Sequence, residues 1–321
     1  MFALNSNVLL TGGTGFFGLA LLRYWRGLGD KAPRVTILSR NPQRFTARYP
    51  DLANFVTWRT GDVQDPTAFD NLGAFTHLLH GATDSTLGAS LESLTRFDQI
   101  LGGTRNALDF ATKAGVRRFL LTSSGGVYGR QPSDLEKIPE HYLAMPDPLD
   151  TKNAYSVAKR ASEHLCALYA ERHQIETVVA RCFAFVGPDL PFNTHFAIGN
   201  FIRDALFEDE ITVSGDGTDV RTYLDQRDLA IWLTTLLDQG VAGEAYNVGS
   251  DQEITISGLA HLVRDRVAPG KRVQILGNSK ASSNRARYVP SIQKAREGLR
   301  LDVKVPLSDA IDFAANAHRR K

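Results

Sequence analysis

Short apolar runs alternate with longer segments whose apolar residues recur at helical spacing through the first part of the chain. The runs have the length of buried strands, and the segments between them have the length of helices. The predicted strands are residues 7–12, 34–39, 54–60, 76–82, 117–123 and 176–182. Such an alternation is typical of a parallel sheet covered by helices on both faces. We therefore predict a doubly wound α/β fold.

A glycine-rich turn comes directly after the first predicted strand. Residues 11–18 read Thr-Gly-Gly-Thr-Gly-Phe-Phe-Gly and lead into a predicted helix at Leu19–Leu28. Gly12 permits a sharp bend, Gly15 lets the backbone approach a pyrophosphate, and Gly18 lets the helix pack closely. The helix dipole would face the phosphates. The predicted dinucleotide contacts are Gly12, Thr14, Gly15, Phe16, Phe17 and Gly18. Glycine also marks ordinary loops, so this prediction depends on matching motifs farther along the chain.

A tyrosine and a lysine stand four residues apart in a later predicted helix. Tyr155-Ser-Val-Ala-Lys159 lies in a segment with helical periodicity from Ala154 to Tyr169, and this spacing puts both side chains on one helix face. A phenol has a pKa of about 10, but a neighbouring ammonium and a nicotinamide cation favour the phenolate. Such a tyrosine can exchange the proton of a sugar hydroxyl as a hydride moves. The same spacing also occurs by chance in many helices.

A serine-rich motif ends the fifth predicted strand. The buried-strand pattern Arg117–Thr122 runs into Ser123-Ser124-Gly125-Gly126-Val127-Tyr128-Gly129. A serine hydroxyl there would lie at the carboxyl end of a strand, where open α/β sheets bind ligands.

Eight motifs now stand in order: Gly12-x-x-Gly15-x-x-Gly18, Gly61-Asp62-Val63, His80-Gly81-Ala82, Ser123-Ser124-Gly-Gly-Val-Tyr-Gly, Tyr155-x-x-x-Lys159, Arg181 through Gly187-Pro188, Gly215-Asp-Gly-Thr-Asp-Val-Arg221 and Tyr246-Asn247-Val-Gly249. In this order and spacing they resemble the extended short-chain dehydrogenase/reductase group, which comprises nucleotide-sugar epimerases, dehydratases and reductases. The resemblance covers nearly the whole chain.

The resemblance implies a role for each matching residue. Tyr155 would be the acid/base, Ser124 would hydrogen-bond the reacting hydroxyl or carbonyl, and Lys159 would hold the nicotinamide ribose and lower the pKa of the tyrosine. Asp62 would meet the adenine, with Val63 beside it, although Gly-Asp is also common turn chemistry. The wall beneath the dinucleotide would comprise His80, Gly81, Ala82 and Thr83.

The coenzyme form is predicted from the end of the second strand. An acidic residue there would accept hydrogen bonds from a ribose 2'-hydroxyl and repel a 2'-phosphate. This chain has Ser39 and Arg40 instead, and a guanidinium beside a hydroxyl suits a phosphate monoester. We predict NADP(H) in preference to NAD(H). The alternative is that Arg40 is a solvated loop charge and that NAD(H) is used.

The resemblance also implies the domain organisation. Residues 1–182 plus 223–268 would form the dinucleotide-binding domain, and residues 183–222 plus 269–321 a smaller, discontinuous α/β substrate lobe. A nucleoside-diphosphate sugar would bind in the cleft between them. The candidate substrate contacts are Thr83, Ser124, Asn193, Asn200, Arg221, Arg285 and Arg287. Arginines are also common on surfaces, and His195 in the same lobe is more typical of a structural residue.

Departures from the family pattern narrow the reaction. Where the dehydratases carry an acidic pair, this chain has Gly125 and Gly126, which argues against sugar 4,6-dehydration. Ala184 and Ile100 stand where many relatives carry asparagines, which puts a plain hexose epimerase in doubt. We favour hydride transfer at the sugar C4 by a 4-keto-sugar reductase. A redox-neutral 4-epimerase is the alternative, and a dinucleotide-binding sensor without catalysis stays open.

Composition excludes some classes of protein. Lysine plus arginine number 37 against 35 acidic residues, so no charge excess points to nucleic acid or a membrane. The two cysteines, Cys166 and Cys182, suggest no disulfide framework, and the start of the chain carries no basic leader. We expect a cytoplasmic enzyme without a metal ion. The resemblance implies a homodimer, and its apolar face could be supplied by Leu91, Leu94, Phe97, Leu101, Leu165 and Leu168. The same apolar stripe could instead simply cover the sheet.

Overall fold

A computed structural model describes residues 6–83, 91–192, 196–277 and 286–319. Within it the chain forms two compact units, which are described separately. The first comprises Met1–Gly129, Leu143–Cys182 and Ala230–Tyr246, and the second Arg130–Tyr142, Phe183–Leu229 and Asn247–Lys321. The chain therefore passes from one unit to the other five times.

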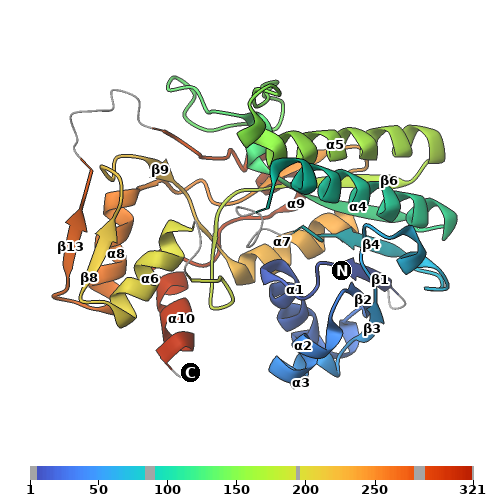
Figure 1. Cartoon of the computed structure of the whole chain (residues 1–321), viewed down its shortest axis with the longest axis horizontal. Helices are drawn as coiled ribbons and strands as arrows, with labels where there is room; N and C mark the ends of the chain where they lie inside the picture. The colour runs from blue at the N-terminus through green and yellow to red at the C-terminus, as the bar shows by residue number, and fades with distance from the viewer. Residues whose placement is uncertain (1–5, 84–90, 193–195, 278–285, 320–321) are drawn as a thin grey trace. The chain divides into compact units, whose positions relative to one another are not determined.

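A seven-stranded sheet forms the centre of the first unit (Figure 1). Its order is β3-β2-β1-β4-β5-β6-β11, and the registers from β3 through to β6 are parallel. The strands are β1 Asn7–Thr11, β2 Arg34–Ser39, β3 Thr57–Thr60, β4 His77–His80, β5 Arg118–Ser124, β6 Glu176–Cys182 and β11 Ala245–Val248. The strand order reverses between β1 and β4, and this is the point at which open α/β sheets bind ligands.

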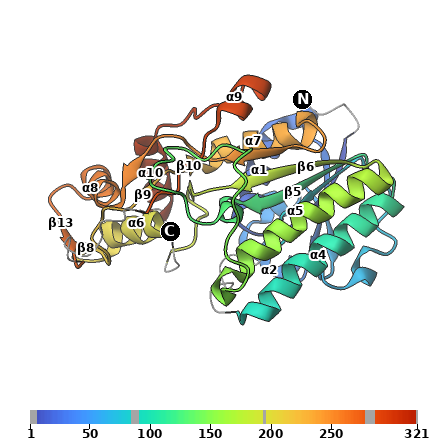
Figure 2. The same cartoon turned by 90° about the horizontal axis from the view of Figure 1, so that it is seen from above.

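Helices cover both faces of this sheet, α4 and α5 on one and α1, α2 and α7 on the other (Figures 1 and 2). They are α1 Phe16–Gly27, α2 Pro42–Arg48, α3 Pro50–Ala53, α4 Ser93–Lys113, α5 Ala154–His173 and α7 Gln226–Gln239, with 3-10 turns at Gly29–Lys31, Pro66–Phe69, Gly125–Tyr128 and Thr151–Asn153. The core beneath α4 and α5 includes Leu108, Phe119 and Cys166. The doubly wound fold predicted from the sequence is confirmed.

Local chemistry sets the ends of these elements. The Glu92 carboxylate accepts hydrogen bonds from the Leu94 and Thr95 amides and so starts α4. Gln174 adopts a left-handed conformation with φ 57° and ends α5. The strand predicted at 54–60 begins only at Thr57, because Asn54 caps α3 and the Phe55 amide bonds back to Leu52.

The second unit contains three two-stranded ladders and four helices among the described residues. β7 Phe185–Val186 pairs with β10 Leu224–Asp225, β8 Glu210–Val213 with β13 Arg272–Ile275, and β9 Val220–Arg221 with β12 Ile254–Thr255. The helices are α6 Ala197–Phe207, α8 Ile256–Val267, α9 Gln293–Leu299 and α10 Leu307–Arg319. Helix α8 packs on α6, α10 and β8, and it therefore belongs to this unit rather than to the first.

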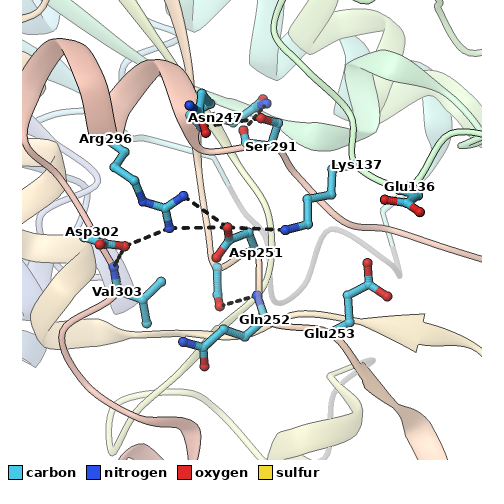
Figure 3. Close-up of polar contacts among 12 residues, drawn as sticks. Glu136, Lys137, Asn247, Asp251, Gln252, Glu253, Ser291, Arg296, Asp302 and Val303 are labelled. Atoms are coloured by element: carbon cyan, nitrogen blue, oxygen red, sulfur yellow. Dashed lines mark hydrogen bonds and ion pairs between the residues drawn. The ribbon is translucent and has the colours of Figure 1, made fainter.

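Polar contacts explain why residues 130–142 also belong to the second unit. Figure 3 shows Asp251 between Lys137 and Arg296, at 3.4 Å and 3.3 Å respectively. The Asn247 amide donates to the carbonyl oxygens of Ile138 and Ser291 at 2.8 and 3.0 Å. The division thus differs from the expected boundaries at residues 130–142, 223–229 and 247–268.

Candidate active site

The glycine-rich turn joins β1 to α1 as the sequence predicts. Gly12 has φ +76°, and a Cβ there would collide with the Gly81 carbonyl. A Cβ on Gly18 would collide with the backbone of Gly13, so this glycine lets the first turn of α1 fold against β1. At Gly15 a Cβ would meet only the Gly12 oxygen, at 3.6 Å. No contact within the described protein therefore requires glycine at position 15.

Gly15 is the N-cap of α1, with φ −89°, and no side chain caps the helix there. Backbone amides and the positive end of a helix dipole form a ready site for phosphate. A glycine that the protein's own packing does not require leaves room for a ligand to lie against the backbone. This turn therefore fits the pyrophosphate of a dinucleotide.

The ends of β2 and β3 lie next to each other at the same edge of the sheet, since Ser39 is in register with Thr60. Ser39 is half-buried and accepts a hydrogen bond from the Asn41 amide at 3.3 Å, while Arg40 is exposed. Asp62 is half-buried, and its carboxylate caps the Gln64 amide at 3.0 Å. Asp62 thus has a turn-forming role, and its contact with adenine stays a prediction.

His80 lies inside the fold. Its side chain is buried, its Nδ1 lies 2.8 Å from the Thr11 hydroxyl, and its ring stacks on Phe119. Burial, and secondarily the Lys159 charge, lowers the pKa of His80 to about 3. The neutral imidazole therefore ties β4 to β1, and the His80 side chain is not available to line a dinucleotide.

The predicted catalytic group comes together at the ends of β5 and α5. Tyr155 and Lys159 share one face of α5, with the ammonium 6.0 Å from the centre of the phenol ring. Lys159 donates to the Thr83 hydroxyl and to the Thr122 carbonyl, each at 2.8 Å. A hydrogen bond joins Ser124 to Tyr155. The structure thus brings all three predicted catalytic residues and Thr83 into one cluster.

Burial governs the protonation of this cluster. It raises the pKa of Tyr155, which the Cys182 thiol also raises and which the Ser124 hydrogen bond and the Arg96 charge oppose. Burial lowers the pKa of Lys159 to about 8, and nearby Cys182 and Glu163 oppose that shift. Burial thus favours the neutral form of both side chains, and groups with such shifted pKa values can exchange a proton with a ligand that enters the site.

Two charged residues near this cluster were not among the sequence predictions. The Arg96 guanidinium lies over the Tyr155 ring, 4.4 Å from its centre. Glu163 accepts hydrogen bonds from Ser123 at 2.6 Å and from Arg181 at 2.8 Å. The side chains of Glu163 and Arg181 are both nearly buried. Glu163 is one turn beyond Lys159 on α5, a spacing that could have suggested it. Arg96 lies in no motif, so the sequence offered no signal for it.

Gly125 and Gly126 follow Ser124, so no acidic side chain stands directly after the serine at the end of β5. The Gly126 amide donates to the Ser124 hydroxyl at 3.1 Å, and a Cβ on Gly126 would lie 2.6 Å from the Ser156 hydroxyl. A larger residue at this position would therefore require Ser156 to move.

The second unit contains the remaining candidates. Arg221 pairs with Asp219 at 3.1 Å, and Arg287 pairs with Glu253 and donates to the Glu136 carbonyl. Asn200 lies in α6, and its amide oxygen is buried. Asn193, His195 and Arg285 lie outside the described residues. The two described arginines already have acidic partners, so binding a diphosphate would require them to share or exchange those partners.

Proteins of similar sequence include UDP-glucuronic acid decarboxylases. The chain is 28% identical to UDP-glucuronic acid decarboxylase 1 of Xenopus tropicalis over 99% of its own length and 73% of the relative's. It is 27% identical to UDP-glucuronic acid decarboxylase 4 of Arabidopsis thaliana over 98% and 69%. No helix in the described part of the chain has the length and apolar character needed to span a membrane.

Solved structures share the fold. A UDP-glucose 4-epimerase of Thermotoga maritima, crystallised with UDP-glucose, superposes with a TM-score of 0.84 at 21% identity, over 98% of this chain and 99% of the other. A dTDP-glucose 4,6-dehydratase of Bacillus anthracis, in complex with NAD, gives 0.82 at 19% identity, over 98% and 97%.

The sequence model of the NAD dependent epimerase/dehydratase family matches residues 8–249, which include the glycine-rich turn, Ser124, Tyr155 and Lys159. The resemblance inferred from the motifs is therefore confirmed at the level of the family. The chain belongs to the NAD dependent epimerase/dehydratase family.

Proposed function

We propose that the protein transfers a hydride between a nicotinamide coenzyme and C4 of a nucleoside-diphosphate sugar, and that it acts as a 4-keto-sugar reductase. The observation that carries this proposal is the cluster of Ser124, Tyr155 and Lys159, in which the phenol is hydrogen-bonded and has an ammonium 6.0 Å from its ring. A single acid/base beside a hydroxyl donor is sufficient for reduction of a ketone.

In the proposed reaction the bound coenzyme supplies the hydride. Tyr155 donates its hydroxyl proton to the carbonyl oxygen, and Ser124 holds that oxygen through a hydrogen bond. The positive charge of Lys159 stabilises the phenolate that Tyr155 leaves behind. Its bonds to Thr83 and the Thr122 carbonyl fix the ammonium in place during this step.

The glycines at 125 and 126 support simple hydride and proton exchange over dehydration. Water loss from a sugar needs a group that removes one proton and a group that protonates the leaving hydroxyl. Glycine supplies neither, and the Ser156 hydroxyl occupies the space beside Gly126.

The coenzyme preference rests on the end of β2. Arg40 is exposed and Ser39 is half-buried, so both can reach a phosphate group from the same strand end. We propose that they select NADP(H), because a guanidinium binds a phosphate monoester well. Titration with NADPH and NADH tests this, and equal or tighter binding of NADH would refute it.

Redox-neutral chemistry is the second candidate, and the similarity to decarboxylases over nearly the whole of this chain favours it. Oxidation at C4 by the same Tyr155 could be followed by return of the hydride to the other face, as in a 4-epimerase. With a uronic acid as substrate, the same oxidation at C4 would create a β-keto acid, which loses carbon dioxide readily. The hydride would then return to the C4 ketone of the resulting pentose. Both routes return the coenzyme to its starting state.

A substrate panel distinguishes these reactions. The purified enzyme is denatured to identify any retained dinucleotide, and is then incubated with dTDP-4-keto-6-deoxyglucose plus NADPH, with UDP-glucose, and with UDP-glucuronate. Oxidation of NADPH in the first sample supports the reductase. Formation of UDP-galactose or carbon dioxide without net coenzyme turnover would replace it with the redox-neutral function. Tight coenzyme binding with no turnover would indicate a sensor.

A further inference from the structure

Helix α4 places a permanent cation on the face of the proposed acid/base. Arg96 lies in the first turn of α4, and its guanidinium carbon is 4.4 Å from the centre of the Tyr155 ring. The Lys159 ammonium is farther from the same centre, at 6.0 Å. Tyr155 therefore has two cations near its ring, one from each of the helices that pack together on this face of the sheet.

The Arg96 charge is not neutralised by a neighbouring carboxylate in the described parts of the chain. Glu163, the nearest acidic residue on α5 to Lys159, pairs with Arg181 and Arg160 instead. The Nε atom of Arg96 is buried and has no hydrogen-bond partner among the residues that the structure describes. A buried donor without a partner is costly, and each such group in a folded protein calls for an explanation, of which a catalytic role is one.

We infer that Arg96 is a positioning residue for proton transfer, whose guanidinium stabilises the phenolate of Tyr155 through the face of the ring. The negative charge of a phenolate spreads into the ring, so a cation over the ring favours the ionised form more than the neutral phenol. The other groups that face Tyr155 are Lys159 on α5, the Ser124 hydroxyl at the end of β5 and the Cys182 thiol at the end of β6.

The two cations differ in one respect that gives Arg96 a distinct role. The pKa of Lys159 is lowered to about 8, so this ammonium loses its charge in mildly alkaline solution. A guanidinium stays charged throughout the physiological range. Arg96 would therefore keep the phenolate accessible under conditions in which Lys159 no longer does.

The inference rests on the proposed function only for the role of the phenolate, and the titration that tests it needs no sugar substrate. The ionisation of Tyr155 is followed by phenolate absorbance near 295 nm between pH 6 and 11 in the presence of NADP⁺, as the difference between each protein and its Tyr155→Phe derivative. We expect Arg96→Gln to raise the Tyr155 midpoint by about one pH unit. Arg96→Lys should restore at least half of that shift, and Arg105→Gln, on an exposed part of the same helix, should leave the midpoint unchanged.

An unchanged midpoint in Arg96→Gln would overturn the inference, as would an equal shift in Arg105→Gln. Circular dichroism establishes that each variant is folded. If Arg96→Gln leaves the midpoint unchanged and instead weakens UDP-glucose binding, Arg96 is a substrate contact and the inference is wrong. A shifted midpoint in a protein that converts no sugar nucleotide would support the inference while refuting the proposed function.

Discussion

At the scale of single residues, the chemistry of this protein depends on how far burial alters two ordinary side chains. Burial raises the pKa of Tyr155 and lowers that of Lys159, so both favour their neutral forms. Each shift is a stability effect as well as a catalytic one, because the unfolded chain does not share it. Two of our predictions concern these residues.

Tyr155→Phe should lower kcat by at least about 100-fold, because it removes the proposed proton donor. Dinucleotide affinity should stay close to that of the wild type, since the ring itself is kept. The matched control is Tyr169→Phe. Tyr169 lies farther along α5, and this change removes a hydroxyl that donates a hydrogen bond to Asp109. Steady-state kinetics and NADPH titration measure both quantities. Retained turnover in Tyr155→Phe would refute the assignment.

The stability of the protein relative to a Lys159→Met variant should increase by about 2 kcal/mol between pH 7 and pH 10. The folded pKa of Lys159 is about 8, below its unfolded value, so the unfolded chain binds more protons between these limits. Below pH 8 folding must bury the Lys159 charge or remove its proton, which lowers the free energy of unfolding. Raising the pH from 8 to 10 reduces this penalty, because the lysine is then neutral in the folded protein. Urea denaturation of both proteins at each pH measures the difference, and parallel pH profiles would contradict the prediction.

The sequence could identify Tyr155, Lys159 and Ser124 because their spacing and order are local properties of the chain. Arg96 and Glu163 depend on the packing of α4 and β6 against α5, which links residues distant in sequence. For His80 the motif could be recognised in the sequence, but the burial of its ring against Thr11 and Phe119 could not be predicted.

At the scale of elements, α5 is fixed to the sheet by a buried ion pair. Glu163 on α5 bonds Arg181 on β6, and their side chains are only 9% and 10% exposed. The Arg181 guanidinium also donates to the Tyr128 hydroxyl at 2.9 Å. The helix that presents Tyr155 and Lys159 is therefore held by contacts to strands β5 and β6.

Glu163→Gln should reduce the free energy of unfolding by about 3 kcal/mol, because it leaves the Arg181 charge buried without its counter-ion. Glu171→Gln, on an exposed position of the same helix, should change it by less than about 0.5 kcal/mol. Thermal and urea denaturation measure both. Equal effects of the two substitutions would show that the pair does not anchor α5.

The sequence predicted elements well where an apolar run met an unambiguous stop. The strand expected at 34–39 and that at 176–182 coincide with β2 and β6. The first helix begins at Phe16 rather than at Leu19, because two phenylalanines hid the start of its periodicity. Short strands such as β9 and β12 contain two residues each, too few for any pattern to reveal.

At the scale of the whole molecule, the expected homodimer concerns the outer surface of α4 and α5. Leu94 and Leu168 are 65% and 45% exposed, whereas Leu165 is buried and Leu101 packs against the core of the first unit. The predicted apolar face is thus divided between the core and the surface, and only its exposed part is free for a second copy.

Leu168→Glu should convert a homodimer into monomers, because a charge would be placed at the centre of an apolar contact. Leu149→Glu is the control, since Leu149 is 90% exposed and lies outside these helices. Sedimentation velocity measures the mass of each protein. A wild type that sediments as a monomer, or a Leu168→Glu variant that stays dimeric, would contradict this prediction.

The repeated passage of the chain between its two units determines the order in which they can form on the ribosome. Residues 130–142 are synthesised long before Asp251, which is the partner of Lys137, and before Arg296, which pairs with the same aspartate (Figure 3). The sheet of the first unit is likewise incomplete until β11, which ends at Val248. A nascent chain must therefore carry unfinished parts of both units through most of its synthesis, with apolar surface exposed to chaperones and proteases.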